Sequence, residues 1–166
     1  MPEATFDSPH FRNVMGHLPT GVSIVTGHGE DGPAGLAVGS FMSVSLEPPL
    51  IAVSPALGST SWPAIQATGR FCVNVLSEAQ AELARRFAIS GGDKFAELEW
   101  RPGPSGSPIL AGAVAWIDCT IESEQTAGDH WLVLGAVVEL DHGTPGDPLI
   151  FHRGAFDHFR PVGPHS

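Results

Sequence analysis

The stretch IDCTIESEQTAGDHWLVLGAVVEL, residues 117–140, decides the fold of this chain. Its first part, residues 117–122, alternates apolar and polar side chains, which is typical of a half-exposed antiparallel strand. Its second part, residues 131–140, is apolar on both faces and indicates a central strand. The link through Gly128-Asp129-His130 is too short for a crossover between parallel strands, so we expect an antiparallel pair.

Further strands are expected on both sides of this pair, because short apolar runs rich in β-branched residues recur between turn residues. These runs cover residues 22–26, 36–46, 50–53, 70–76 and 149–151. Residues 91–108 are rich in Gly, Pro and Ser and read as a loop. The sequence therefore predicts a mainly β protein, an antiparallel barrel.

Three short helices are expected among these strands. Ser8-Pro9 has the form of an N-cap followed by proline at the first helical position, and apolar residues then recur at helical spacing up to Pro19. The polar loop of residues 58–63 enters a second helix that includes Ile65. Residues 77–80 form a capping box for a third helix, which runs through Phe87.

Composition indicates one domain that spans residues 1–166 and excludes several functions. Only 16% of the residues are charged, against roughly 25% in a typical soluble chain. Such a surface suggests that a second subunit covers part of it. The formal charge of −10 argues against nucleic acid and against an anionic membrane surface as partners.

The two cysteines and the N-terminus indicate a cytoplasmic protein. Cys72 and Cys119 lie inside apolar runs and are expected to be buried thiols in a reducing compartment. No apolar stretch approaches the ~20 residues that span a bilayer. The N-terminus lacks the basic and apolar regions of a secretion signal.

Several catalytic motifs are absent or misleading. Residues 27–32, GHGEDG, match the G-x-G-x-x-G spacing of dinucleotide sites, but a strand follows them in place of a helix, and Glu30 and Asp31 would repel phosphates. A hairpin turn is the favoured interpretation. None of the eight histidines belongs to an H-E-x-x-H motif, so no metal is expected. The G-x-S-x-G elbow and the phosphate-binding loop with lysine are also missing.

Small residues and hydroxyls in loops remain as candidates. The glycine of Gly39-Ser40-Phe41-Met42-Ser43 permits close approach of a ligand to the backbone. Gly58-Ser59-Thr60-Ser61 offers hydroxyls that form either a phosphate cradle or an ordinary helix cap. The turn at residues 128–130 and the segment Phe151-His152-Arg153-Gly154 are either functional or simply solvated.

Taken together and in this order, eight groups of residues resemble the flavin reductase family with the FMN-binding split-barrel fold. The likeness covers residues 11–156, nearly the whole chain, and leaves short flexible tails. The groups are FR at 11–12 with MG at 15–16 and TGV at 20–22; SF at 40–41 with SVSL at 43–46 and PPL at 48–50; S59, S61, WP at 62–63 and I65; GRF at 69–71 with VNVL at 73–76; A84 with RFA at 86–88; DKF at 93–95; GDH at 128–130; and HRG at 152–154.

This resemblance implies a homodimer that passes a hydride from NADH or NADPH to FAD or FMN. It also implies that a partner monooxygenase receives the free reduced flavin. Such a transfer is chemistry of the two cofactors, so the missing acid–base motifs are no obstacle. The implied flavin-ring contacts are Ala37, Val38, Gly39, Ser40 and Phe41, bordered by His152 and Arg153. The implied phosphate and tail contacts are Ser59, Thr60, Ser61, Phe87, Ala88 and Lys94, while His130 positions the nicotinamide.

The chain also departs from the family pattern. The family usually carries Asn at the position of Gly39, Thr at Met42, and Arg and Tyr at Ala155 and Phe156. These differences keep two other interpretations open. One is an electron carrier or sensor that binds FMN tightly without oxidising NAD(P)H. The other is an interaction module without flavin.

Overall fold

The computed structural model describes residues 4–163. The helices are α1 (Ser8–Met15), α2 (Trp62–Gln66) and α3 (Ala81–Ala88), with the 3₁₀ helix η1 (Glu78–Gln80) before α3. The strands are β1 (Thr20–Gly21), β2 (Ser23–Gly29), β3 (Gly32–Val38), β4 (Met42–Leu46), β5 (Pro49–Val53), β6 (Arg70–Val75), β7 (Trp100–Pro102), β8 (Pro108–Leu110), β9 (Ala115–Ala127), β10 (His130–His142), β11 (Leu149–His152) and β12 (Ala155–His158).

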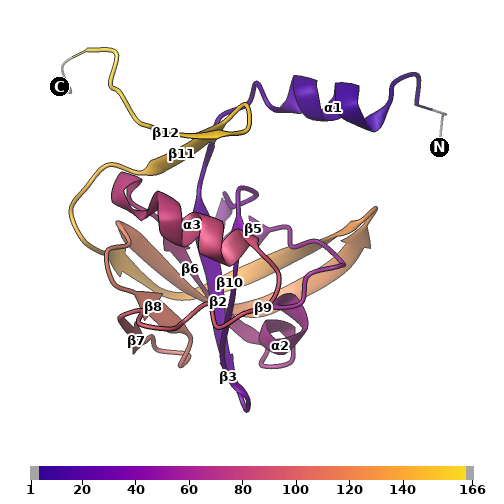
Figure 1. Cartoon of the computed structure of the whole chain (residues 1–166). Helices are drawn as coiled ribbons and strands as arrows, with labels where there is room; N and C mark the ends of the chain where they lie inside the picture. The colour runs from indigo at the N-terminus through magenta and orange to yellow at the C-terminus, as the bar shows by residue number, and fades with distance from the viewer. Residues whose placement is uncertain (1–3, 164–166) are drawn as a thin grey trace.

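One seven-stranded sheet forms the body of the molecule, in the order β3-β2-β6-β9-β10-β5-β4 (Figure 1). Within the described residues every strand pairing is antiparallel. The long pair β9–β10 lies inside the sheet and has two register shifts. Strand β10 is apolar enough to accept a neighbouring strand on each side. The prediction of a mainly β, antiparallel fold with three short α-helices is confirmed.

The core of the sheet holds side chains from both halves of the strand order. Leu36 and Val38 of β3 share one cluster with Ile51 and Val53 of β5, and Phe71 lies in the same cluster. Burial of each large side chain contributes about 1.5–3 kcal/mol. A second cluster lies where α3 packs, with Ala84 and Phe87 of that helix buried.

Residues 27–32, which match the spacing of a dinucleotide-binding motif, form a hairpin turn, as predicted. Strands β2 and β3 pair from Ser23 opposite Val38 to Gly29 opposite Gly32. Gly32 has a φ of +103°, a conformation that glycine adopts without steric cost. No helix begins there to meet a phosphate.

Four details of the sequence prediction were wrong. Asp7, not Ser8, caps α1 and accepts a hydrogen bond from His10 N at 2.8 Å. The run 36–46 is two strands, because the chain leaves β3 after Val38 and β4 begins only at Met42. The segment expected to be only loop contains β7, which pairs with β8. The fourth concerns Asp118.

Asp118 is fully buried, although the alternating pattern of β9 predicted that it faces solvent. The loop between β7 and β8 covers it. Ser105 N donates to Asp118 Oδ2 at 2.6 Å, and Ser105 Oγ donates to Asp118 Oδ1 at 2.6 Å. These hydrogen bonds replace the ones that the carboxylate would make to water in the unfolded chain.

Both cysteines are buried and free, as predicted. Burial raises the pKa of Cys119 to about 12, and the negative charge of Asp118 acts in the same direction. Burial likewise raises the pKa of Cys72 far above its ordinary value, again with help from Asp118. Neither thiol ionises near neutral pH.

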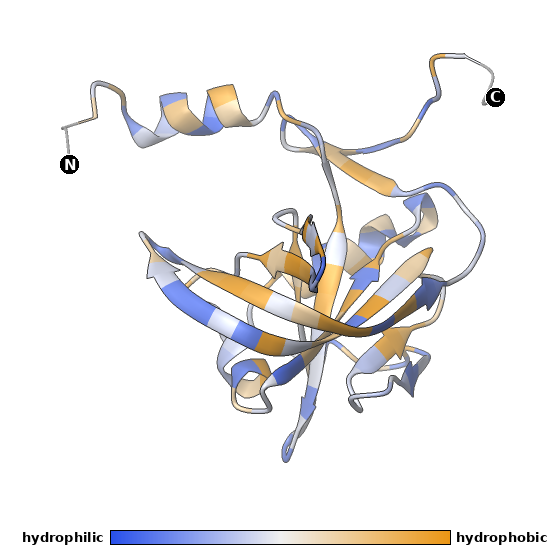
Figure 2. Ribbon diagram, turned by 180° about the vertical axis from the view of Figure 1, so that it is seen from behind, coloured by the Kyte–Doolittle hydropathy of each residue, from blue (hydrophilic) through white to orange (hydrophobic). Residues whose placement is uncertain are grey.

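Several large apolar side chains remain exposed, and some of them form two groups. Helix α1 stands away from the sheets and buries none of its residues, so Phe11 keeps 51% of its surface exposed (Figure 2). The second group lies on the edge strand β4, where Leu46 is 86% exposed, and near the end of β10, where Leu140 is 59% exposed.

Among residues 4–163, no helix combines the length and apolar character needed to cross a bilayer. The same residues contain no group of three or more His, Cys, Asp or Glu side chains arranged to hold a metal ion.

Replacing Gly35 by Ala is expected to lower the free energy of unfolding by about 1–3 kcal/mol, the usual cost of over-packing. A Cβ at Gly35 would lie 2.6 Å from Cε1 of the buried Phe87 ring. Urea unfolding measures the change. Gly21→Ala is the control, since nothing lies within 4 Å of a Cβ there. Equal effects of the two substitutions would contradict this account.

Candidate functional site

A cavity of about 520 Å³ brings together most of the predicted site residues. Its wall is formed by the end of β3, the loop after β5, the end of α3 and the turn between β9 and β10. This volume lies within the range of small-molecule and cofactor sites. The predicted residues that line it are Ala37, Val38, Gly39, Ser40, Ser59, Thr60, Ser61, Phe87, Ala88, Lys94 and His130.

The backbone of β3 supplies one side of the cavity. Strand β3 is at the edge of the sheet, so alternate residues direct their N–H and C=O groups away from β2. Gly35 is one of these residues, because its carbonyl accepts from Lys94. Two positions further along, the N–H and C=O of Ala37 therefore point the same way. They offer a planar ligand a donor and an acceptor.

Two serine hydroxyls at the other end of the cavity keep their protons available. Ser59 Oγ accepts from the N–H groups of Ser61 and Trp62, at 3.3 and 3.1 Å. Ser61 Oγ accepts from Lys94 Nζ at 3.3 Å. Each oxygen is used as an acceptor, which leaves its O–H free to donate. Ser59 thus caps the turn that leads into α2, whose N-cap residue is Ser61, and keeps its O–H as a candidate phosphate donor.

Lys94 fixes this end of the cavity. Its Nζ donates to Gly35 O, Phe87 O and Ser61 Oγ at 3.2, 3.2 and 3.3 Å. Three acceptors match the three protons of an ammonium group. Partial burial lowers the pKa of Lys94 from its ordinary value. The result is a cation beside the two serine hydroxyls.

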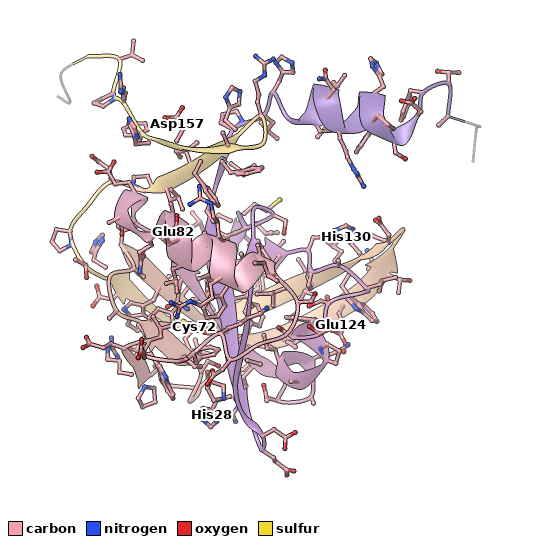
Figure 3. All side chains as sticks on the ribbon, viewed as in Figure 1. His28, Cys72, Glu82, Glu124, His130 and Asp157 are labelled. Carbon is pink, nitrogen blue, oxygen red and sulfur yellow. The ribbon has the colours of Figure 1, made fainter. Side chains whose placement is uncertain are left out.

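His130 lies at the rim, where the long β9–β10 hairpin turns (Figure 3). Its Nδ1 is 2.7 Å from Asp129 Oδ1. The hydrogen bond from His130, and then its charge, hold the pKa of Asp129 below its usual range. A carboxylate that accepts from Nδ1–H leaves Nε2 as the free ring nitrogen.

Two residues predicted from the ring-binding segment have structural contacts. The Ser40 hydroxyl accepts from Ser54 N at 2.9 Å and donates to Ser54 O at 3.3 Å, so only its backbone is free for a ligand. A Cβ at Gly39 would lie 2.9 Å from Thr20 Oγ1. Glycine at this position therefore leaves room for Thr20.

Three predicted residues lie outside this cavity. Phe41 packs against the main core cluster. His152 and Arg153 lie at the turn of the β11–β12 hairpin, where Arg153 N donates to Gly16 O at 3.0 Å. A neighbouring cavity of about 150 Å³ connects this hairpin to Ala37–Gly39. The ring-bordering role of His152 and Arg153 stays a prediction.

Sequence reasoning missed part of the lining. The additional residues are Leu36, Ser54, Pro55, Ala56, Ile89 and Ser90, whereas Gly58 belongs to the predicted phosphate cradle. Most of them stand next to predicted site residues, and widening the predicted segments by a few positions would have included them. Ser54 has no such signal, since only its contact with Ser40, 14 residues away, brings it to the site.

The comparison with known families confirms the predicted resemblance. The family described as "Flavin reductase like domain" matches residues 15–160, and this chain belongs to that family.

Close relatives carry names that agree with this family. A flavin reductase of Pseudomonas putida is 49% identical over 160 residues, which cover 96% of this chain and 94% of that protein. The reductase subunit HsaB of a flavin-dependent monooxygenase from Mycobacterium tuberculosis H37Rv is 45% identical, covering 95% of this chain and 86% of that protein.

Solved structures agree as well. Nitrilotriacetate monooxygenase component B from Mycobacterium thermoresistibile superposes with a TM-score of 0.91 at 42% identity, covering 96% of this chain and 90% of that one. The NADH:FAD oxidoreductase SgcE6 of Streptomyces globisporus, in complex with NAD and FAD fragments, has a TM-score of 0.88 at 36% identity and covers 95% and 96%.

Ser59→Ala and Ser61→Ala are each expected to weaken binding of FMN by about 1–3 kcal/mol, because each would lose a hydrogen bond to a charged phosphate. Calorimetric titration with FMN and with phosphate-free riboflavin measures the difference. Ser43→Ala, on β4 outside the cavity, is the control. An equal loss for riboflavin would place the phosphate elsewhere.

Proposed function

We propose that this chain is an NAD(P)H-dependent flavin reductase that transfers a hydride from NADH or NADPH to FAD or FMN. One observation carries the proposal. A single cavity combines the outward-facing backbone of Ala37, the hydroxyls of Ser59 and Ser61, the Lys94 ammonium and the imidazole of His130.

The residues present fit a flavin. Backbone N–H and C=O groups at Ala37 match the alternating acceptors and donors along the edge of an isoalloxazine ring. Two O–H donors and one cation, Ser59, Ser61 and Lys94, match a phosphate. Phe87 and Ala88 supply apolar surface between these polar ends.

Bound together, nicotinamide and flavin supply the hydride chemistry themselves. The tasks of the protein are to bind, to orient and to exclude water. The β3 backbone would hold the ring and the two serines would hold the phosphate, so the flavin is fixed at both ends. Lys94 offsets the negative charge of the phosphate at close range. The net charge of −10 on the chain acts from farther away and is screened by salt beyond ~8–10 Å.

His130 is proposed to position the nicotinamide. Asp129 holds its ring through Nδ1, so Nε2 is left free to hydrogen-bond with the carboxamide of the hydride donor. The carboxylate of Asp129 is itself solvent-exposed and does not enter the cavity lining.

We also propose that the single domain is a split barrel. The support is that β3 and β5, from opposite halves of the strand order, contribute to one core cluster. A sheet that curls until its two halves share a core has this form.

The proposed assembly is a homodimer that delivers free reduced flavin to a separate monooxygenase. The exposed apolar side chains of α1, β4 and β10 support the dimer, since a monomer rarely leaves such surface uncovered. Relatives named as reductase components of monooxygenases support the delivery role.

The deciding experiment mixes the protein, NADH or NADPH, and FAD or FMN in air. Nicotinamide absorbance is expected to fall only when protein and flavin are both present. Absence of a fall with all four donor–acceptor pairs would refute the proposal. A protein that stays yellow through dialysis and ignores NADH would instead select the FMN carrier or sensor.

His130→Ala is expected to raise the KM for NADH about tenfold, the effect of losing roughly 1.4 kcal/mol, while flavin affinity changes little. Asp129→Ala should act in the same direction, and the double variant should not be additive. His28→Ala, at the far end of the β2–β3 hairpin, is the control. Unchanged kinetics for NADH would make His130 an ordinary solvated turn residue.

The protein is expected to have the mass of two chains in solution, and Leu140→Glu should shift it toward one chain, because a buried charge in an apolar interface is costly. Light scattering after size exclusion measures the mass. Val162→Glu changes an equally apolar, fully exposed side chain of the C-terminal segment and should leave the mass unchanged. A monomeric wild type would refute the dimer.

A further inference from the structure

A second cavity of about 300 Å³ adjoins the phosphate end of the first. Three residues, Thr60, Ser61 and Lys94, line both cavities. The two cavities therefore meet at the hydroxyls of Thr60 and Ser61 and the ammonium of Lys94. A ligand bound at this junction can extend into both cavities.

The walls of the second cavity differ from those of the first. Gly91 and Gly92 have φ values of +80° and +72°, a conformation that glycine adopts without steric cost, so one wall is bare backbone. Pro33 and Phe95 add apolar surface. These walls suit a flat heterocycle better than a second phosphate.

One carboxylate lines this cavity. Asp93 Oδ1 accepts from Phe95 N at 3.1 Å, so its other oxygen has no partner within the described residues and is left to accept from a ligand hydroxyl. A carboxylate disfavours a terminal phosphate but bonds well to ribose hydroxyls. Apart from Lys94 at the junction, no cation lines the second cavity.

We propose that the second cavity holds the adenylate half of FAD, which makes this chain selective for FAD over FMN. The inference rests on the proposed flavin site. The pyrophosphate would lie at Ser61 and Lys94, where the two cavities meet. The adenosine would lie beyond them against Pro33, with its ribose toward Asp93. FMN ends at the junction and leaves the second cavity unused.

The test fills the second cavity without altering the first. Pro33 lines only the second cavity and lies on the edge strand β3, where a tryptophan is a good strand residue. Ala96→Trp is the control, because Ala96 is exposed in the same loop and lines neither cavity. Asp93→Ala is a second variant that removes the carboxylate without adding bulk.

Calorimetric titration is expected to give wild-type affinity for FAD at least about tenfold above that for FMN. Pro33→Trp should abolish this difference by weakening FAD alone. Asp93→Ala should reduce it, and Ala96→Trp should preserve it. Steady-state KM values for NADH should be unchanged in all three variants.

Equal wild-type affinities, or an equal loss of both flavins in Pro33→Trp, would overturn the assignment and leave the flavin reductase proposal intact. A raised KM for NADH with unchanged FAD affinity would also overturn it, because the cavity would then hold the adenylate half of the nicotinamide cofactor. Failure of wild type to bind either flavin would overturn both proposals.

Discussion

The ammonium group of Lys94 joins three segments that are distant in the sequence. It donates to the carbonyl of Gly35 on β3, to the carbonyl of Phe87 at the end of α3 and to the hydroxyl of Ser61 before α2. Each contact is charge-assisted, and partial burial strengthens it relative to water. The edge strand, the helix and the serine loop are thereby held around one cavity, and the same lysine forms the boundary with the second cavity.

The fold supplies the site mainly through backbone groups that have no partner in the sheet. A strand edge is usually a liability, because its free N–H and C=O groups recruit other strands. Here β3 carries Pro33, and α3 and the loop with Lys94 lie over its outer side. The remaining groups at Ala37 are directed into a cavity that a planar ligand fits. Binding at such an edge tolerates substitutions such as Gly39, since it depends little on side chains.

Local patterns in the sequence predicted most strands, the β2–β3 hairpin and the α2 loop, because each depends on neighbouring residues. Features that depend on distant contacts were not predictable in this way. Asp118 has an exposed pattern in its own strand, and only the loop carrying Ser105 buries it. The sequence alone did not decide whether Ser59 caps the backbone or binds a phosphate. In the structure its oxygen caps a turn and its proton remains available to donate.

The burial of Cys72 and Cys119 has a chemical benefit in an enzyme of this kind. Reduced flavin that escapes into aerated solution generates hydrogen peroxide, and peroxide attacks thiolates rather than thiols. Burial and the nearby Asp118 carboxylate keep both sulfur atoms protonated and out of contact with solvent. Neither thiol is therefore a ready target for the oxidant that reduced flavin forms in air.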